Sequence, residues 1–362
     1  MKRILTVITT QFVPYGGLTT VAMNYYRHIN HARFNMDFAS TNDVPKGLQR
    51  ELSANGSAYY KLPARKKFIQ YYSALKKLCR SYDIVHVHAN SATATIELSA
   101  AKSAGVKKRI IHIHNTTCSH MTVHRVLKPI FDKTYTDAIA CSKMAGEWIF
   151  PAGKYLVLNN AIDLDRYAFS EENRRDVREE FGLKDALVLG HVGKMVCQKN
   201  HEFLINVFSR LHAQNPNSKL LLVGDGELRN NIESQIEQLG LTDAVVLTGM
   251  VNEAERYLSA MDCFVFPSSW EGLPLSVLEA QVNGLACVVS DKVTREVGLT
   301  DNIYFLPIGR DEEELTEEWA YAISNLRSIS RKNQSAQNCE AVCAAGFDIR
   351  LNASRLEEVY CL

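Results

Sequence analysis

Two carboxylates eight positions apart, Glu271 and Glu279, flank the start of an apolar segment in the last third of the sequence. The intervening Gly272-Leu273-Pro274 is typical of a loop that opens a helix, so Glu279 is expected about two turns in. A helix start exposes unpaired backbone N–H groups that attract an anion such as a nucleotide diphosphate, and a carboxylate there can contact sugar hydroxyls. The structural alternative is that Glu271 only complements the helix dipole and Glu279 is solvated.

Two lysines form a second candidate group. Lys194 and Lys199 follow an aliphatic run at 187–192, and on a strand-to-helix loop they can converge on one diphosphate as point charges. Each signal is weak alone, and exposed surface lysines are the alternative. The next two expected strands end in small-residue turns where a nucleoside can pack against backbone: Gly224-Asp225-Gly226-Glu227 and Thr248-Gly249-Met250-Val251.

Glycines and histidines end the expected strands of the first half. Gly16-Gly17 allows close backbone approach before a helix, but it is not GxGxxG, and a tight turn is the alternative. His114 ends its strand and is the histidine best placed to reach a cleft. Alternation puts His112 and His114 on one face, and His86 and His88 form an equivalent set. Four histidines raise the question of a metal, but buried parallel strands without an interleaved carboxylate argue against it.

Short β-branched runs alternate with amphipathic stretches along the whole sequence, which predicts right-handed βαβ units and parallel sheets covered on both faces. The pattern restarts after the segment 159–163. We therefore expect an α/β protein with domains at 1–165 and 166–345, a linker at 163–169, and a last helix at about 346–362 that packs back on the first domain. The expected strands are 4–10, 35–39, 83–89, 109–114, 138–141, 187–192, 219–223, 244–247, 263–266 and 286–289.

Length and charge support this division. The 362 residues exceed what one core usually organises. Residues 1–165 hold 22 Lys and Arg against 10 Asp and Glu, whereas residues 166–362 hold 19 against 30. A basic half suits a nucleic acid, an anionic membrane surface or a phosphorylated substrate, although charge blocks can simply solvate a surface. Nine cysteines without a CxxC pair, no apolar stretch near 18–20 residues and no signal-peptide pattern together predict a cytoplasmic location.

Taken in order, these residues resemble the retaining glycosyltransferases of the GT-B fold, specifically family four, over nearly the whole chain. The segments 84–88 and 111–116 are similar to those of the exopolysaccharide and capsule subgroup. The resemblance implies two Rossmann-like doubly wound domains that face a central cleft. The motifs that carry it are Gly16-Gly17, His114, Asn159-Asn160-Ala161-Ile162-Asp163, Gly193-Lys194 with Lys199, Gly224-Asp225-Gly226, and the element from Glu271 to Glu279.

The same resemblance implies a role for each matching residue. Lys194, Lys199 and the Gly17 backbone would hold the donor diphosphate, Glu279 the ribose and Glu271 the transferred sugar. His114 would lie by the reacting centre and accept a hydrogen bond from a sugar hydroxyl. Gly272, Leu273 and Pro274 would supply amides, and Met250 and Val251 would flank the base. Further implied substrate-binding positions are Gly16, Asn115, Gly193 and Gly224.

Three departures from the family pattern affect these expectations. Lys194 stands where Arg is usual and loses bidentate reach, and Asn160 replaces a common Gly. Thr19 and Thr20 stand where acidic and basic residues are frequent, which leaves the acceptor side open.

The implied reaction is retaining hexosyl transfer from a nucleoside-diphosphate sugar, most simply a UDP-sugar, to a saccharide acceptor carried on polyprenyl diphosphate. Neither a metal nor a cofactor is expected, because lysines and helix amides can stabilise the leaving diphosphate. Asp163-Leu164-Asp165 imitates a metal-binding DxD, but its place predicts hinge and helix-cap chemistry. A nucleotide-sugar 2-epimerase is the alternative enzyme, and a nucleic-acid-binding protein is a distant one that the acidic second half disfavours.

The segment 61–77 combines cations with aromatic residues in one helix-prone stretch, and Lys107, Lys108, Arg109, Arg125 and Lys128 extend it. This composition suits an anionic bilayer surface or a lipid diphosphate acceptor. We therefore expect peripheral attachment to the inner face of the cell membrane through the first domain. A solvated helix face is the alternative.

Overall fold

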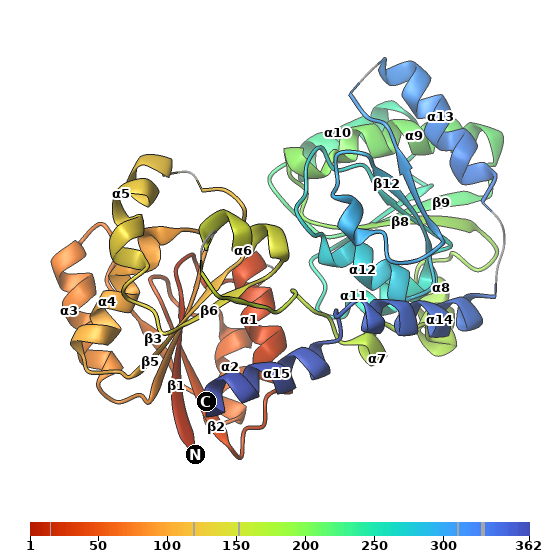
Figure 1. Cartoon of the computed structure of the whole chain (residues 1–362). Coiled ribbons are helices and arrows are strands. Elements are labelled where there is room, and N and C mark those ends of the chain that lie inside the picture. The colour runs from red at the N-terminus through yellow and green to blue at the C-terminus, as the bar shows by residue number, and fades with distance from the viewer. Residues whose placement is uncertain (15, 119, 151–152, 310, 327–329) are drawn as a thin grey trace. The chain divides into compact units, whose positions relative to one another are not determined.

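The chain folds around two separate parallel sheets, as the computed structural model in Figure 1 shows. The structure describes every residue except 15, 119, 151–152, 310 and 327–329. Unit 1 comprises Met1–Ala161 and Gly346–Leu362, and unit 2 comprises Ile162–Ala345. The boundary expected at 165 lies inside the short helix α7, Leu164–Tyr167, whose N-cap Asp163 accepts a hydrogen bond from the Arg166 amide. The helix-cap interpretation of the DxD-like segment is therefore confirmed.

Unit 1 has the strand order β3-β2-β1-β4-β5-β6-β7 within the described residues, and every pairing is parallel. The order reverses between the neighbours β1 and β4, which is where open sheets of this kind bind ligands. The strands are β1 Lys2–Ile8, β2 Phe34–Ser40, β3 Tyr59–Lys61, β4 Ile84–Ala89, β5 Lys108–Ile113, β6 Asp137–Ala140 and β7 Leu156–Val157.

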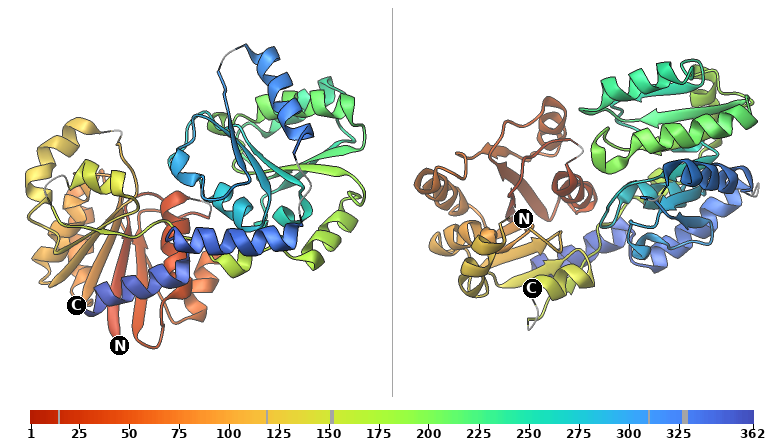
Figure 2. Two further views of the ribbon diagram at one scale, coloured as in Figure 1. Left: turned by 45° about the vertical axis from the view of Figure 1, so that its right-hand side comes forward. Right: turned by 90° about the horizontal axis from the view of Figure 1, so that it is seen from above.

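Helices cover both faces of this sheet (Figure 2). Buried residues of α1, α2 and α15 form one core with it, and those of α3, α4, α5 and α6 form the other. The helix α15 follows unit 2 in the sequence yet packs on α1 of unit 1, where Tyr360 is fully buried. The helices are α1 Gly17–His28, α2 Lys46–Ala54, α3 Phe68–Cys79, η1 Ala92–Ala94, α4 Thr95–Ser103, α5 Met121–Phe131, α6 Lys143–Ile149 and α15 Ile349–Cys361.

Unit 2 repeats the plan with the described strand order β10-β9-β8-β11-β12-β13, which reverses between β8 and β11. A core of α9, α10 and α13 side chains covers one face, and Figure 1 shows α8, α11, α12 and α14 along the other. The strands are β8 Leu187–Val192, β9 Ser218–Val223, β10 Val245–Gly249, β11 Cys263–Phe266, β12 Ala286–Ser290 and β13 Ile303–Leu306. The remaining helices are α8 Glu171–Glu180, η2 Cys197–Lys199, α9 His201–Gln214, α10 Arg229–Gln238, α11 Ala254–Ala260, α12 Leu275–Val282, η3 Arg295–Val297, α13 Glu312–Ser324 and α14 Arg331–Ala344.

The predicted α/β class with two parallel sheets is confirmed, and all ten expected strands are present with small shifts at their ends. Three strands were not predicted: β3, β7 and β13. Each is two to four residues long and lies at the edge of its sheet. So short a strand contributes too little apolar periodicity to be recognised in the sequence.

Asp262 anchors α8 to the sheet of unit 2. Its carboxylate accepts hydrogen bonds from Arg174 Nη2 and Arg178 Nη2, both at 2.6 Å, and from the Val188 amide at 2.8 Å. Arg178 is itself buried and also donates to the Ala260 carbonyl. Asp262 therefore balances two cations, one of which has lost most of its contact with water.

We predict that Asp262→Asn lowers the free energy of unfolding by about 3 kcal/mol, because it leaves a buried guanidinium without its counter-charge. Urea denaturation followed by circular dichroism measures this loss. Asp176→Asn is the matched control, since Asp176 pairs with Arg175 in the open, where an ion pair contributes about 0–1 kcal/mol. Equal losses in the two variants would contradict the anchoring role of Asp262.

Candidate active site

The loops that follow β8 and β11 meet where the strand order of unit 2 reverses. Lys199, at the end of η2, places Nζ 2.6 Å from Glu271 Oε1 and 4.5 Å from the centre of the Phe266 ring. The side chains of this ion pair are only 16% and 14% exposed. Two further hydrogen bonds join the same loops, from the Ser269 amide to the Gln198 carbonyl and from Gln198 Nε2 to the Trp270 carbonyl. The structure thus brings together two residues that the sequence placed in different motifs.

Lys194 lies on the same loop as Lys199 but differs from it in exposure and in ion pairing. It is exposed, and no ion pair to it is found within the described ranges. Lys199 is already neutralised by Glu271, whereas the charge of Lys194 is available to an incoming anion.

Three glycines let the neighbouring loops lie directly against one another. Gly224 has a φ of +140°, and a Cβ atom there would lie 2.0 Å from the Gly193 carbonyl oxygen. A Cβ atom on Gly226 would lie 2.3 Å from the Met195 carbonyl oxygen. Backbone hydrogen bonds from Gly193 to Val223 and from Gly224 to Gly249 complete the contact. Since only backbone fits here, Gly193 and Gly224 let the loops after β8 and β9 lie in direct contact.

The residues expected around the nucleotide lie at the ends of β10 and at the start of α12. Met250 follows β10 and is 52% exposed, and Val251 comes next. Gly272 is exposed with open space around it, and Pro274 is the N-cap of α12. One expectation is wrong here: Pro274 has no backbone N–H and cannot supply an amide. The amides at this helix start belong to Gly272, Leu273 and Leu275.

Glu279 lies in the second turn of α12 among residues that the sequence did not single out. Burial raises the pKa of Glu279 to about 7, while a hydrogen bond from Tyr167 and the charge of Arg166 oppose the shift. Arg166 Nε is also 3.0 Å from Glu255 Oε1, so the cation is shared between two carboxylates. Tyr167 and Arg166 come from α7, and no motif marks them. Glu279 is not the solvated helical residue of the structural alternative.

In unit 1, the paired glycines begin α1. Gly16 is the N-cap, and a Cβ atom on it would be 3.1 Å from the Val13 side chain. A Cβ atom on Gly17 would meet nothing within 4 Å. Protein packing therefore explains Gly16 but leaves open space beside Gly17. Asn115 follows the carboxyl end of β5 and is exposed. Its Oδ1 accepts a hydrogen bond from the backbone amide of the next residue, Thr116.

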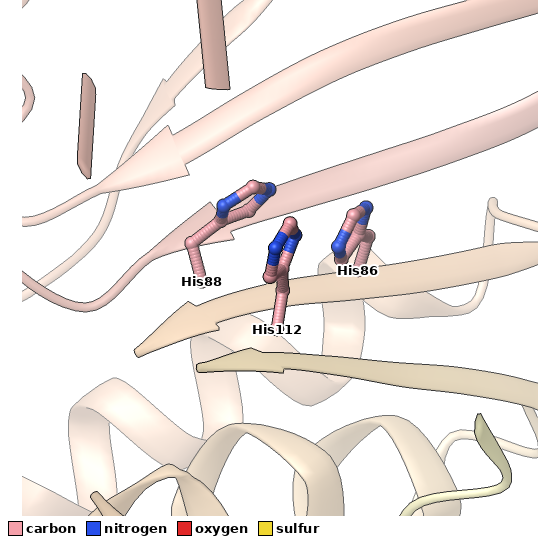
Figure 3. Close-up of side chains that lie close together, drawn as sticks. All are labelled: His86, His88 and His112. Atoms are coloured by element: carbon pink, nitrogen blue, oxygen red, sulfur yellow. The ribbon is translucent and has the colours of Figure 1, made fainter. Parts of the chain in front are cut away.

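The four histidines of β4 and β5 share one face of the sheet instead of forming two sets. His88 pairs in register with His112, and His86 and His114 lie two residues away on the same faces of their strands. Figure 3 shows three of the rings grouped together. His86 Nδ1 bonds Tyr360 Oη at 2.7 Å, and His88 Nδ1 lies 2.9 Å from His114 Nε2.

All four histidines are neutral at physiological pH. Burial lowers the pKa of His86 to about 3 and that of His114 to about 4. The pKa values of His88 and His112 are also lowered well below the usual value by burial, with the neighbouring histidines adding to the shift. His114 Nδ1 lies 3.2 Å from Asn160 Oδ1, so both of its ring nitrogens have protein partners.

His86, His88 and His112 form a possible metal-binding group, since one ligand atom from each lies within 4.8 Å of the others. Tetrahedral zinc would need nitrogens about 3.3 Å apart. The rings pack in tilted or parallel arrangements, with centroids 4.4 to 5.5 Å apart, and His86 Nε2 and both ring nitrogens of His112 are buried without a hydrogen-bond partner among the described residues. The set is also uncharged and would leave a buried dication without an anionic ligand. The lack of an anionic ligand argues against a metal here, and the absence of a metal stays a prediction.

A family model described as "Glycosyl transferases group 1" matches residues 173–338, which lie in unit 2. Over 313 residues the chain is 30% identical to the UDP-Gal:alpha-D-GlcNAc-diphosphoundecaprenol alpha-1,3-galactosyltransferase of Escherichia coli, covering 82% of this chain and 79% of that protein. It is 27% identical to the capsular polysaccharide biosynthesis glycosyltransferase CapH of Staphylococcus aureus over 366 residues, or 95% of each chain.

A solved structure shares the fold over the full length. The crystal structure of Anabaena Alr3699/HepE in complex with UDP-glucose has a TM-score of 0.77 at 18% identity and covers 100% of both chains. The GT-B architecture expected from the motifs is therefore confirmed. Together with the two relatives, this likeness shows that the chain belongs to the group 1 glycosyltransferases of the GT-B fold, among relatives that include an enzyme of capsular polysaccharide biosynthesis.

Proposed function

We propose that this glycosyltransferase moves a hexosyl unit, with retention of configuration, from a UDP-sugar to a saccharide carried on polyprenyl diphosphate in exopolysaccharide or capsule synthesis. The observation that carries the proposal is the Lys199–Glu271 pair at the switch point of unit 2, beside the exposed Lys194 and the start of α12. The printed activity of the Escherichia coli relative, a transfer from UDP-Gal to a diphosphoundecaprenol-linked sugar, supports the same donor and acceptor classes.

The donor site follows from the chemistry of the leaving group. Negative charge grows on the diphosphate as the sugar departs, and Lys194 and Lys199 stabilise it as point charges. Amides at the start of α12 add to this stabilisation. The base packs by Met250 and Val251, and Glu279 accepts hydrogen bonds from the ribose. Cationic side chains thus do the work for which a divalent ion would otherwise be needed, and we propose that donor binding requires neither metal nor cofactor.

Glu271 would contact the transferred sugar while its partner Lys199 turns to the diphosphate. Donor binding therefore exchanges one ion pair for two contacts, with the cation kept neutralised throughout. The loop 267–274 carries no carboxylate besides Glu271, so the loop itself offers no acid and nucleophile pair. We propose that the leaving phosphate itself takes the proton of the acceptor hydroxyl.

The surface of unit 1 supports contact with a membrane. The sequence drew attention to α3, where Phe68 is 53% and Ile69 is 81% exposed. On α5, which carries the expected Arg125 and Lys128, the structure adds the exposed apolar residues Val126 and Ile130. Both α3 and α5 lie next to α4. No helix among the described residues is long and apolar enough to cross a membrane. Apolar side chains beside cations fit peripheral docking on an anionic inner leaflet, close to a lipid-linked acceptor.

Transfer and binding can be separated experimentally. UDP release from a UDP-sugar should require a polyprenyl-diphosphate saccharide and should persist in EDTA.

Lys199→Ala should weaken UDP binding by about 1.5–3 kcal/mol, the scale of a charge-assisted contact. Glu271→Ala should retain UDP binding, because it frees Lys199, yet lose most transfer. Calorimetry and a coupled UDP assay measure the two effects, and Lys184→Ala is the control for an exposed lysine of unit 2. UDP release without acceptor would instead favour the 2-epimerase.

Donor affinity should depend on pH through Glu279. Ribose hydroxyls donate to the ionised carboxylate, so binding favours deprotonation of a group whose pKa is about 7 before binding. Affinity for UDP-glucose, which has no phosphate titrating in this range, should be about tenfold weaker at pH 6 than at pH 8. Glu279→Gln should remove the pH dependence. An unchanged pH profile in this variant would contradict the ribose contact.

Membrane docking predicts that the protein co-sediments with anionic vesicles at low salt. The double variant Val126→Ser and Ile130→Ser should reduce the bound fraction several-fold, because each serine removes buried apolar contact with the acyl region. Leu239→Ser, at an exposed apolar site of unit 2, is the control. Binding that ignores both salt and anionic lipid would contradict the proposed surface.

A further inference from the structure

The ammonium group of Lys199 has two neighbours in the structure, an anion and an aromatic ring. Its Nζ lies 2.6 Å from Glu271 Oε1 and sits over the ring of Phe266, 4.5 Å from the ring centre. An ammonium within about 6 Å of a ring centroid is attracted by the negative face of the ring, and the attraction grows when the pair is poorly hydrated. Phe266 is fully buried and the Lys199 side chain is largely buried, so this cation–π contact lies in such surroundings.

Buried neighbours hold the Phe266 ring in place. Phe266 is the last residue of β11, and its ring centre lies 5.4 Å from that of His191 on β8 and 5.9 Å from that of Phe264, with all three rings nearly parallel. His191 Nδ1 donates a hydrogen bond to the Val265 carbonyl oxygen at 2.9 Å, which fixes this ring as well. Burial lowers the pKa of His191 well below its usual value, so the ring is neutral and does not repel the Lys199 cation.

We infer that Phe266 is a positioning residue, whose ring holds the ammonium of Lys199 in place while the lysine exchanges Glu271 for the donor diphosphate. This inference rests on the proposed function, in which Lys199 binds the diphosphate. A ring attracts a cation without carrying a net charge, so it does not repel the incoming diphosphate as a second carboxylate would. The lysine stays ordered when Glu271 turns to the sugar. Donor binding then does not carry the full entropic cost of ordering a long side chain.

Phe264 provides a matched control on the same strand. It lies two residues before Phe266 on the same face, is fully buried, and its ring also packs parallel to His191, with an interplanar angle of 5°. No cation lies over the Phe264 ring in the described part of the chain. Replacing either phenylalanine by leucine removes one ring from the same core, but only Phe266→Leu removes the aromatic neighbour of Lys199.

The position of Lys199 can be measured without any donor, by nuclear magnetic resonance of the full-length protein with labelled lysine. A Lys199→Gln variant assigns the signals, and the ring current of Phe266 should shift the methylene protons next to Nζ upfield. The shift should persist in Glu271→Ala, because the ring holds the cation independently of the carboxylate. It should disappear in Phe266→Leu and remain in Phe264→Leu. An unchanged Lys199 signal in Phe266→Leu would overturn the inference.

Calorimetry with UDP measures the effect on donor binding. Mono-, di- and trifluorophenylalanine in place of Phe266 weaken the negative face of the ring in steps with little change of shape, so a merely structural role would not register them. In the Glu271→Ala protein, UDP affinity should fall in steps, by about threefold or more with the trifluorinated ring, which is the scale of ordering one long side chain. The loss should be smaller in the wild-type background, because Glu271 still orders the lysine there.

The same fluorinated series in place of Phe264 should leave UDP affinity unchanged. Equal losses at the two positions would contradict the positioning role of Phe266. A different result would separate this inference from the proposed function. If Lys199 stays over the ring in Glu271→Ala but fluorination of Phe266 does not change UDP affinity, the hold of Phe266 on Lys199 is supported and the contact of Lys199 with the diphosphate fails.

Discussion

One ion pair, between Lys199 and Glu271, organises the candidate donor site. It spans the point where the strand order of unit 2 reverses, and its low exposure makes it stronger than a surface pair. The loops that carry it are also joined by two hydrogen bonds of Gln198, which hold the two backbones next to each other. The ion pair keeps two reactive charges balanced in the absence of ligand. In the proposed function, an anionic donor binds by exchange of partners, and neither charge is left unpaired in a poorly solvated site.

Much of this site could be predicted from the sequence because buried parallel strands can be recognised as short aliphatic runs. The strands Leu187–Val192 and Cys263–Phe266 were predicted with their observed bounds. Since parallel strands end at one edge of a sheet, the residues after them must gather there. This rule, together with the family resemblance, predicts that the lysine loop and the first carboxylate of the α12 element serve one donor site. It could not reveal that Lys199 and Glu271 bond each other, because that depends on side-chain reach.

The parts that escaped prediction depend on packing between distant segments. Tyr167 and Arg166 surround Glu279 although they come from a short helix that looked like a linker. The histidines share one face because β4 and β5 align in a register that no local pattern states, and Asn160 reaches His114 from beyond β7. The error at Pro274 was of another kind. Proline has no backbone N–H in any fold, so this position could not match the family pattern whatever the structure.

The placement of α15 in unit 1 has a consequence for how the protein folds during its synthesis. The last helix of the chain completes the core of the first unit, and Tyr360 bonds His86 from the other end of the sequence. On the ribosome, unit 1 must therefore wait for all of unit 2 to be synthesised, on the order of ten seconds or more, before its final helix emerges. Until then, the apolar surface that α15 covers is exposed and can make non-native contacts. The nascent chain thus has a defined window in which a chaperone would matter most.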